Sequence, residues 1–337
     1  MKLRVAVIGM GSMGRNHARV YSELPEAELV GIADSNGELA EQAGRLLGVP
    51  GYGGEPTSYT QLLDQQHPQA VSIAVPTALH EEVALAALER GAHILIEKPI
   101  ASSLASGQRI IERANAVGRL LMVGHIVRFN PAIQALREKL LSGELGRIYQ
   151  IACRRVGPFP DRIRDVGVVV DLATHDLDLM RFLTGMNPLR VFAETEQHIH
   201  TEHEDMLLGV LRFPNDISAL LEINWLSPTK IREVTVLGEG GLLRVDDLTQ
   251  DLYYYENAQA SNLAWLSLQN IKGVSEGSMT RQALQRYEPL KAELQAFLQA
   301  IVNHAPAPVS GADGLAALRL ALALIESAQH HQPVQIQ

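Results

Sequence analysis

The chain has 337 residues, 46% of them hydrophobic and 20% charged, and this length and composition predict a globular protein with two domains. The net charge of −9, from 29 basic and 38 acidic residues, argues against broad binding to nucleic-acid phosphates. The single cysteine excludes an internal disulfide framework, and without an apolar run of roughly 18 residues or a signal-peptide pattern we expect a cytoplasmic protein with no membrane partner.

The first third of the chain alternates short apolar runs with helical segments. We expect buried strands at residues 3–9, 27–34, 70–76, 93–99 and 119–125. Helices are expected between them, the first at residues 12–24 and the second ending at Gly48. Because parallel neighbours need crossover connections, this pattern predicts a doubly wound parallel α/β sheet, which we assign to a domain spanning residues 1–123.

From residue 124 the pattern changes, and we assign residues 124–337 to a second, α+β domain. A helix, a strand and a loop rich in Gly, Pro and Arg lead to another helix at residues 168–183. Strands then follow one another directly at residues 190–200, 205–213, 217–226, 232–238 and 242–247. Residues 214–216 and 238–241 are expected to form hairpin turns, so the sheet is predicted to be open and mostly antiparallel. Two helices, at residues 284–301 and 311–329, close the chain.

The first motif with chemistry is "GMGSMG", which lies between the first strand and the first helix. Two of its glycines would let the backbone approach a pyrophosphate, and the third would let helix and strand pack closely. The alternative is a glycine turn without any dinucleotide. The residues of this loop that we expect to hold a cofactor are Gly9, Gly11, Ser12, Met13 and Gly14.

An acidic residue supports a dinucleotide at this loop. Asp34 ends the second strand, 20 residues beyond Gly14. A carboxylate at this position accepts hydrogen bonds from the ribose hydroxyls and would repel the 2′-phosphate of NADP. Ser35 and Asn36 offer no compensating cation, so we expect NAD rather than NADP.

The second motif is "ILIEKPIA", in which Glu97 and Lys98 end a buried strand. Ligands of open α/β sheets bind beyond the carboxyl ends of the strands. A lysine there can stabilise alkoxide character during hydride transfer, although an ordinary surface lysine is the alternative. Pro76, Thr77 and His80 follow the preceding strand at the same edge, and with Glu97 they are expected to neighbour the cofactor.

The helix at residues 168–183 carries Asp171, His175 and Asp178 at positions i, i+4 and i+7, which share one face of an α-helix. One interpretation is the solvated side of an amphipathic helix. The other is a reaction site, in which His175 acts as general base for a hydroxyl and Asp171 orients the imidazole or binds a substrate hydroxyl.

Taken in order, "VAVIGMGSMGRNHAR", "IAVPTALH", "EKP" and "DLATHDLDLMRFL" resemble the Gfo/Idh/MocA family of glucose-fructose oxidoreductases and inositol dehydrogenases. The resemblance covers almost the whole chain. It implies a Rossmann domain followed by an α/β domain whose open sheet often builds homodimers or homotetramers. It also implies that Lys98, Asp171 and His175, which match the family's motifs, lie at the nicotinamide end of the cofactor.

Arginines gather just ahead of the 168–183 helix and suggest the substrate class. Arg154, Arg155, Arg162 and Arg164 suit a diphosphate, although salt bridging within a dimer is an alternative. This loop and the downstream "WLSPTKIREVTVLGEGG" are similar to family members that oxidise the C3 hydroxyl of UDP-N-acetylglucosamine. The sequence therefore predicts a nucleotide-linked sugar as substrate, with an inositol or a free sugar as the alternative.

Other features leave their alternatives open. His125 and Asn130 stand where the domains are expected to join and are assigned to substrate binding, although Asn130 before Pro131 is equally a helix N-cap. The acid- and histidine-rich segment at residues 198–205 is interpreted as a polar hairpin rather than a metal site. Two further functions remain open: a glycosidase that uses NAD transiently, and a non-catalytic NAD sensor.

Overall fold

The computed structural model describes residues 2–160, 166–199, 202–258 and 276–336. The chain divides into two compact units. Unit 1 comprises Met1–Phe129 and Tyr287–Arg319, and unit 2 comprises Asn130–Arg286 and Leu320–Gln337. The boundary expected at residues 123 and 124 lies near the first crossing, but the structure returns residues 287–319 to unit 1, which the sequence did not indicate.

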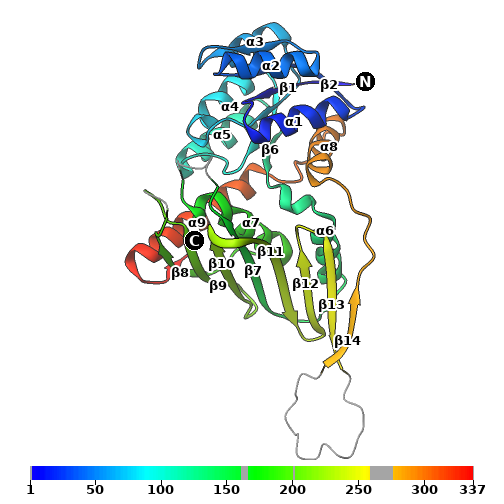
Figure 1. Cartoon of the computed structure of the whole chain (residues 1–337), viewed down its shortest axis with the longest axis vertical. Coiled ribbons are helices and arrows are strands. Elements are labelled where there is room, and N and C mark those ends of the chain that lie inside the picture. Colours follow the sequence, from blue (N-terminus) through cyan, green and yellow to red (C-terminus); the bar gives the residue numbers. More distant parts are fainter. Residues whose placement is uncertain (1, 161–165, 200–201, 259–275, 337) are drawn as a thin grey trace, which may run out of the picture. The chain divides into compact units, whose positions relative to one another are not determined.

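Unit 1 is built on a parallel sheet, drawn in blue to cyan in Figure 1. Its strand order is β3-β2-β1-β4-β5-β6. Its strands are β1 (Leu3–Ile8), β2 (Ala27–Asp34), β3 (Gly51–Gly53), β4 (Ala70–Ile73), β5 (His93–Glu97) and β6 (Leu121–Gly124). Its helices are α1 (Ser12–Glu23), α2 (Gly37–Leu47), α3 (Ser58–Gln66), α4 (His80–Glu89), α5 (Leu104–Ala116) and α8 (Pro289–Val302). The doubly wound sheet predicted from the sequence is confirmed. The edge strand β3 escaped prediction because three residues, two of them glycine, carry no periodicity.

Helix α8 explains why unit 1 takes back a late segment of the chain. It packs against α1 and against η2 (Ile126–Phe129), and it buries Leu290, Leu294 and Phe297. The amide of Val123 on β6 also donates to the carbonyl of Val309, beyond this helix. The core of unit 1 is therefore closed by residues about 165 to 185 positions downstream of its last strand.

Unit 2 is built on a mixed sheet with the order β14-β13-β12-β11-β7-β10-β9-β8-β15. The strands are β7 (Ile148–Pro158), β8 (Arg190–Glu196), β9 (Met206–Arg212), β10 (Ser218–Asn224), β11 (Leu226–Gly238), β12 (Gly241–Asp246), β13 (Asp251–Asn257), β14 (Glu276–Arg281) and β15 (Val334–Gln335). The mostly antiparallel character is confirmed, but β7 lies between β10 and β11 and runs parallel to β10. The sequence missed β13, β14 and β15.

The hairpin turns follow the residue types that the sequence placed there. Asn215 and Asp216 have φ angles of 59° and 62°, which suit the turn that joins β9 to β10. Gly241 has a φ of 145°, which an L side chain rarely adopts, and it begins β12 after the turn from β11. Both expected turns are confirmed.

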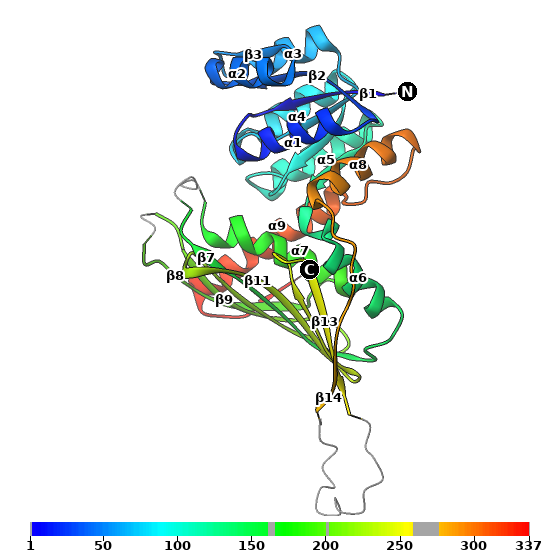
Figure 2. The same cartoon turned by 45° about the vertical axis from the view of Figure 1, so that its right-hand side comes forward.

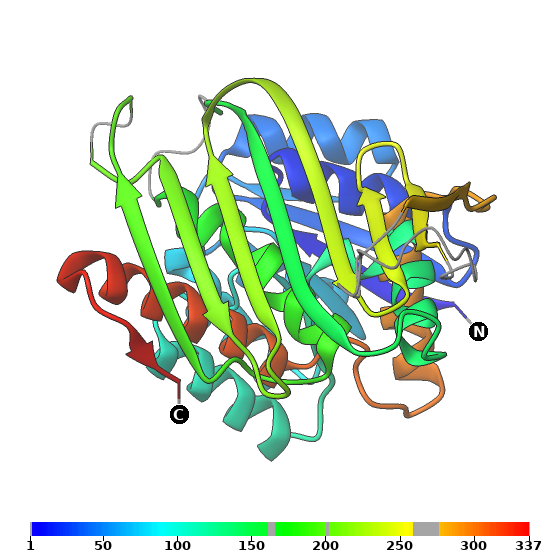
Figure 3. The same ribbon diagram turned by 90° about the horizontal axis from the view of Figure 1, so that it is seen from below.

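One face of the sheet of unit 2 is covered and the other is open (Figures 2 and 3). The covering helices are α6 (Pro131–Leu141), α7 (Thr174–Thr184) and the part of α9 (Gly311–His330) that belongs to unit 2. Successive side chains of a strand alternate between faces, so Leu207 and Leu211 are buried while Leu208 and Val210 are exposed. Within the described residues, no helix is both long enough and apolar enough to span a membrane.

Candidate functional site

The glycine loop between β1 and α1 is shaped by close backbone approaches. Gly9 has a φ of 91°, and a Cβ on Gly14 would overlap the carbonyl oxygen of Gly9, so neither position accepts a side chain. A Cβ on Gly11, by contrast, would have no atom within 4 Å. Gly11 caps α1, whose first N–H groups have no partners within the helix. The loop is therefore open where a helix N-terminus favours a phosphate, which fits the pyrophosphate of a dinucleotide.

Asp34 connects this loop to the end of β2. Its Oδ2 accepts a hydrogen bond from the amide of Met10 at 2.6 Å, and its Oδ1 accepts one from the amide of Asn36 at 2.8 Å. The side chain of Asn36 in turn caps α2. A carboxylate has about four lone-pair positions, so Asp34 keeps acceptor capacity for ribose hydroxyls.

Glu97, which was expected beside the cofactor, has a structural partner on α1. Its Oε1 lies 2.9 Å from Nε2 of the buried His17, and the amide of Lys98 lies 3.3 Å from its Oε2. Burial raises the pKa of Glu97, but the hydrogen bond and charge of His17 together with the charge of Lys98 outweigh it and lower that pKa overall. A Cβ on Gly124 would lie 3.1 Å from this carboxyl group, so a side chain at that position of β6 would crowd the pair. The pair fixes α1 against the strand end that carries Lys98.

His80 is also buried rather than facing a ligand, with 1% of its surface exposed. Its Nδ1 lies 2.9 Å from the carbonyl oxygen of Pro99, and its Nε2 lies 3.0 Å from that of Val75. The ring thus joins the segments that follow β4 and β5. Pro76 and Thr77, in the same segment, are exposed and half-buried, so they stay available as neighbours of a cofactor.

The helix that was expected to be regular over residues 168–183 begins with a π-turn. Residues Val169–Ala173 form this turn and contain Asp171, and α7 follows from Thr174. A π-turn widens the spacing and changes the phase of the predicted stripe. Asp171 and His175 are half-buried and Asp178 is fully buried, so the stripe is not a solvated face.

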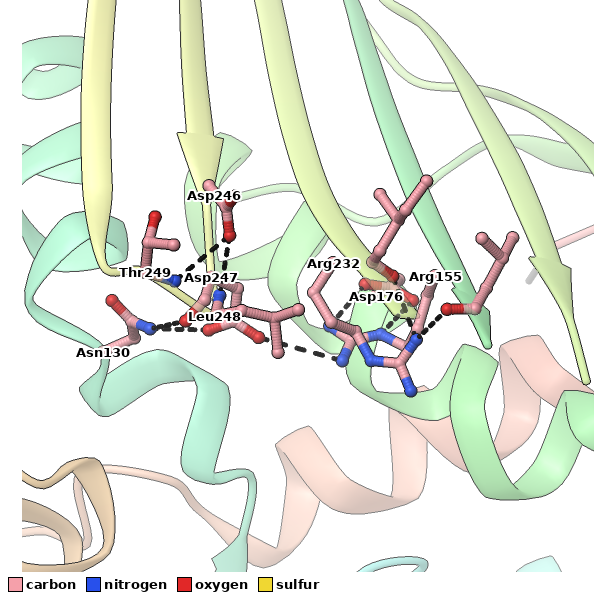
Figure 4. A network of polar contacts seen from close by, with 10 residues as sticks. Asn130, Arg155, Asp176, Arg232, Asp246, Asp247, Leu248 and Thr249 are labelled. Atoms are coloured by element: carbon pink, nitrogen blue, oxygen red, sulfur yellow. Dashed lines mark hydrogen bonds and ion pairs between the residues drawn. The ribbon is translucent and has the colours of Figure 1, made fainter. Parts of the chain in front are cut away.

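The start of α7 is held by a buried ion pair between Arg155 and Asp176 (Figure 4). Nε of Arg155 lies 2.7 Å from Oδ2 of Asp176, and Nη2 lies 2.9 Å from Oδ1. Burial lowers the pKa of Arg155, but the charge and hydrogen bonds of Asp176 outweigh it and raise that pKa. Because Asp176 follows His175 directly, the pair orients the turn that carries the expected base.

Asp247 and Asn130 continue this network (Figure 4). Oδ2 of Asp247 lies 3.9 Å from Nη1 of Arg155, and the Asn130 amide donates to both the carbonyl oxygen and Oδ1 of Asp247. Burial raises the pKa of Asp247 even though Arg155 and Asn130 oppose the shift. Asn130 also accepts from the amide of Ala132, which confirms the N-cap interpretation.

The two described arginines that were expected to clamp a diphosphate, Arg154 and Arg155, do not come together. Arg154 and Arg155 are adjacent on β7 and therefore point to opposite faces of the sheet. Arg154 lies on the open face, 3.0 Å from Glu222, and Arg155 is engaged by Asp176. Arg162 and Arg164 lie outside the described residues.

Two further sequence features are located in the structure. His125, assigned to substrate binding, is buried in unit 1 with 1% of its surface exposed. The carboxylate of Asp205 accepts hydrogen bonds from the amides of His198 and Ile199, while His200 lies outside the described residues. Across the ranges that the structure describes, no group of three or more His, Cys, Asp or Glu side chains is placed to hold a metal.

Several residues of these clusters were not singled out in the sequence, namely His17, Asp176 and Asp247. Asp176 has one signal in the sequence, because it stands directly beside His175, an expected catalytic residue. The others have none, because their partners lie on elements distant in sequence.

Comparison with known proteins agrees with both halves of the chain. Residues 3–125 match a family model described as an oxidoreductase family with an NAD-binding Rossmann fold, and residues 133–244 match the GFO/IDH/MocA C-terminal domain. UDP-N-acetylglucosamine 3-dehydrogenase from Acidithiobacillus ferrooxidans is 31% identical over 320 residues, which is 95% of either chain. Its solved structure gives a TM-score of 0.84 at 29% identity and covers 98% of this chain and 99% of that one. The scyllo-inositol 2-dehydrogenase (NAD(+)) of Bacillus subtilis is 26% identical over 350 residues, covering 99% of this chain and 96% of that one.

Proposed function

The chain belongs to the Gfo/Idh/MocA family of oxidoreductases, and on that premise we propose that it oxidises the C3 hydroxyl of a UDP-N-acetylhexosamine with NAD. The observation that carries the proposal is the 31% identity to a UDP-N-acetylglucosamine 3-dehydrogenase over 95% of the chain. Relatives that act on inositol are less similar over the same length, with 26% identity in the case of the Bacillus subtilis protein.

Unit 1 supplies the residues proposed to hold the cofactor. The open glycine loop receives the pyrophosphate, and Asp34 accepts hydrogen bonds from the ribose that carries the adenine. When bound, NAD accepts the hydride. An Asp34→Ser variant is expected to lose preference for NAD over NADP, because the carboxylate that would repel a 2′-phosphate is gone. Dissociation constants of the two cofactors test this, and an unchanged preference would contradict it.

Three side chains are proposed to take the proton of the substrate hydroxyl or to stabilise the negative charge that develops on its oxygen. His175 takes the proton from the hydroxyl, and Asp171 in the π-turn orients the imidazole. Lys98, at the end of β5, stabilises the developing alkoxide. The buried pairs beside them, Glu97 with His17 and Asp176 with Arg155, are positioning groups that do not touch the substrate.

The direct test follows NADH absorbance when the protein is mixed with NAD and one of four substrates. These are UDP-N-acetylglucosamine, UDP-N-acetylgalactosamine, UDP-glucose and myo-inositol. NADH is expected only with a UDP-N-acetylhexosamine, and Lys98→Ala and His175→Ala are expected to abolish it. If only myo-inositol gives NADH, the assignment of a nucleotide sugar as substrate is wrong and the substrate is an inositol. Release of free sugar without net NADH would indicate transient redox glycosidase chemistry, and NAD binding without any reaction would indicate a sensor.

The open face of the sheet in unit 2 is proposed to pack against a second copy of the chain. A hollow of about 510 Å³ on the sheet is lined by residues that include Leu208, Val210, Leu220 and Phe192. Exposed apolar patches of this kind are typical of interfaces. A Leu208→Glu, Leu220→Glu double variant is expected to convert a dimer into monomers in light scattering. A wild-type protein that is already monomeric would refute this assignment.

A further inference from the structure

The anion-binding residues of a nucleotide-sugar site must be sought elsewhere than in Arg154 and Arg155. The first faces away from the helix-covered side of the sheet, and the charge of the second is already balanced by the buried carboxylate of Asp176. Two other basic residues lie on the neighbouring strand β11, in the segment "PTKIR". They are Lys230 and Arg232.

Arg232 lies on the same face of the sheet as Arg155. The two are direct cross-strand partners in the β7–β11 pair, so their side chains project to the same side, and their guanidinium groups lie near one another in Figure 4. Asp176 of α7 meets Arg155 on this face, which is therefore the covered face. Arg232 belongs to the side of the sheet that carries the π-turn and α7.

The guanidinium of Arg232 is only partly satisfied. Its Nη1 donates to the carbonyl oxygens of Val156 at 2.9 Å and Ile231 at 3.0 Å. Within the described residues no carboxylate lies within 4.0 Å of the Arg232 guanidinium, and its Nε and Nη2 make no hydrogen bond to a neighbouring side chain (Figure 4). Guanidinium carries five N–H donors, so most of this fork is left for another acceptor.

Arg232 keeps its charge at neutral pH and lies in the field of the expected catalytic segment. Burial and the nearby Arg155 lower its pKa to about 10, while the carboxylates of Asp176, Asp247 and Asp171 act in the opposite direction. Asp171 belongs to the π-turn, and Asp176 to the helix α7 that follows it. Because the half-buried guanidinium of Arg232 lies near that of Arg155, the binding of an anion beside Arg232 would reduce the repulsion between the two cations.

Lys230 adds a second charge on the same face. Gly157 is two residues beyond Arg155 on β7, so a Cβ on Gly157 would point to the covered side, as the side chain of Arg155 does. That Cβ would lie 3.7 Å from Cγ of Lys230, so the side chain of Lys230 lies on the covered side as well. Lys230 is exposed and has no ion pair in the part of the chain that the structure describes. A glycine opposite it leaves room beside its side chain for a ligand.

We propose that Lys230 and Arg232 form the subsite that binds the diphosphate of a nucleotide-linked substrate. A planar guanidinium with free donors matches two phosphate oxygens at once, and the lysine supplies a mobile point charge beside it. The assignment rests on the proposed function for the identity of the substrate. It also predicts that binding depends on the diphosphate rather than on the sugar.

Calorimetric binding of UDP, with uridine as the uncharged probe, tests the subsite without any hydride transfer. Arg232→Gln is expected to weaken UDP binding about 10- to 100-fold, and Lys230→Gln about 3- to 10-fold. Uridine affinity is expected to stay unchanged in both variants. The dependence of UDP affinity on salt should become shallower with each lost charge.

The matched control is Arg147→Gln, which removes an exposed arginine next to β7 whose partner Glu239 is 4.0 Å away. It is expected to bind UDP as the wild type does. Thermal unfolding and NAD affinity show whether each variant is folded, and the exposed Lys230 provides a variant that does not disturb packing.

The outcomes separate this assignment from the proposed reaction. If UDP binds the wild type and both variants equally, or does not bind at all, the subsite is refuted even where UDP-sugars yield NADH. If UDP binding is weakened by both variants while no UDP-sugar is oxidised, the subsite stands and the proposed reaction fails. Loss of uridine affinity in step with UDP would also refute a role confined to the diphosphate.

Discussion

Each unit buries a polar cluster, and the two clusters balance their charges differently. In unit 2, Arg155 and Asp176 meet through two hydrogen bonds, and Asp247 is held by Asn130. In unit 1, the cluster contains two carboxyl groups, Glu97 on β5 and Glu293 on α8. Only the first of these two has a hydrogen-bonding partner among the described side chains, and that partner is His17.

Glu293 is the clearest contrast with Asp176. It is completely buried, and neither of its carboxyl oxygens has a hydrogen-bond partner among the described residues. Burial, reinforced by the charge of Glu97, raises the pKa of Glu293 well above its usual value. A buried acid without a cation takes up a proton, whereas a buried acid beside a guanidinium keeps its charge.

The two clusters nevertheless have the same place relative to the expected chemistry. Glu97 precedes Lys98, and Asp176 follows His175. In both cases the neighbour of a proposed catalytic residue is a buried carboxylate that fixes a second element, α1 in one unit and β7 in the other. We infer that the buried carboxylate next to each proposed catalytic residue in the chain holds the backbone of that residue rigid.

The largest expected effect comes from removing the acid of the balanced pair. Asp176→Ala leaves Arg155 buried without its partner, and breaking such a pair costs about 3–5 kcal/mol of unfolding free energy. Urea unfolding followed by circular dichroism measures this loss. Replacing both residues, as in Arg155→Met with Asp176→Leu, is expected to restore most of it, because neither member of the pair is left as an uncompensated charge. A double variant as unstable as Asp176→Ala would show that the helix needs the charges themselves.

Removing the unpaired acid of unit 1 is expected to change the pH dependence of stability. Because the folded-state pKa of Glu293 is raised above its unfolded value of about 4.3, folding is favoured below that value and loses up to about 1.4 kcal/mol per pH unit above it. The stability of Glu293→Gln relative to the wild type should therefore increase as the pH rises above the unfolded value. The control Glu288→Gln removes an exposed acid that directly precedes the same helix and pairs with Arg19, and it should change the profile much less. If the profiles of Glu293→Gln and the wild type are parallel, the protonated state of Glu293 is contradicted.

His17→Ala tests the charged half of the same cluster. It leaves the Glu97 carboxylate buried without its hydrogen bond, which costs about 1–3 kcal/mol. His17→Gln, which keeps an N–H donor, should recover part of the loss. The lowered pKa of Glu97 gives a stabilising contribution that is present at neutral pH and lost on acidification, so His17→Ala should flatten the acid limb of the stability curve. Equal stability of both variants and the wild type would show that the pair is not formed.

Local patterns in the sequence were enough to predict the parallel sheet, the glycine loop and the hairpin turns. The loop between β1 and α1 is recognisable from its glycines, whose spacing follows from backbone contacts. The turn at Asn215 and Asp216 is recognisable because these residue types tolerate a positive φ. The return of α8 to unit 1 was not predictable in this way. Its apolar face shows that it must pack, but no local signal tells against which sheet.

The site was predictable to the extent that its residues stand in motifs. The positions of Asp171 and His175 on one segment were visible, but the π-turn between Val169 and Ala173 was not, because no residue type requires it. Arg155 was noticed as a cation and assigned to a ligand, whereas the structure gives it to Asp176. Such an exchange of partners depends on which face of β7 each arginine occupies, and that requires the register of the sheet.

The smallest expected effect concerns Asn130, which links the network of unit 2 to a helix end. Its side-chain oxygen caps α6, and its amide donates to Asp247. Asn130→Ala loses both and is expected to cost about 1–2 kcal/mol, while Asn130→Ser keeps a capping oxygen and should cost less. The difference between the variants, measured by urea unfolding, gives the contribution of the cap. A Ser variant no better than Ala would mean that Asn130 acts through Asp247, and that the balance of this cluster extends beyond its single ion pair.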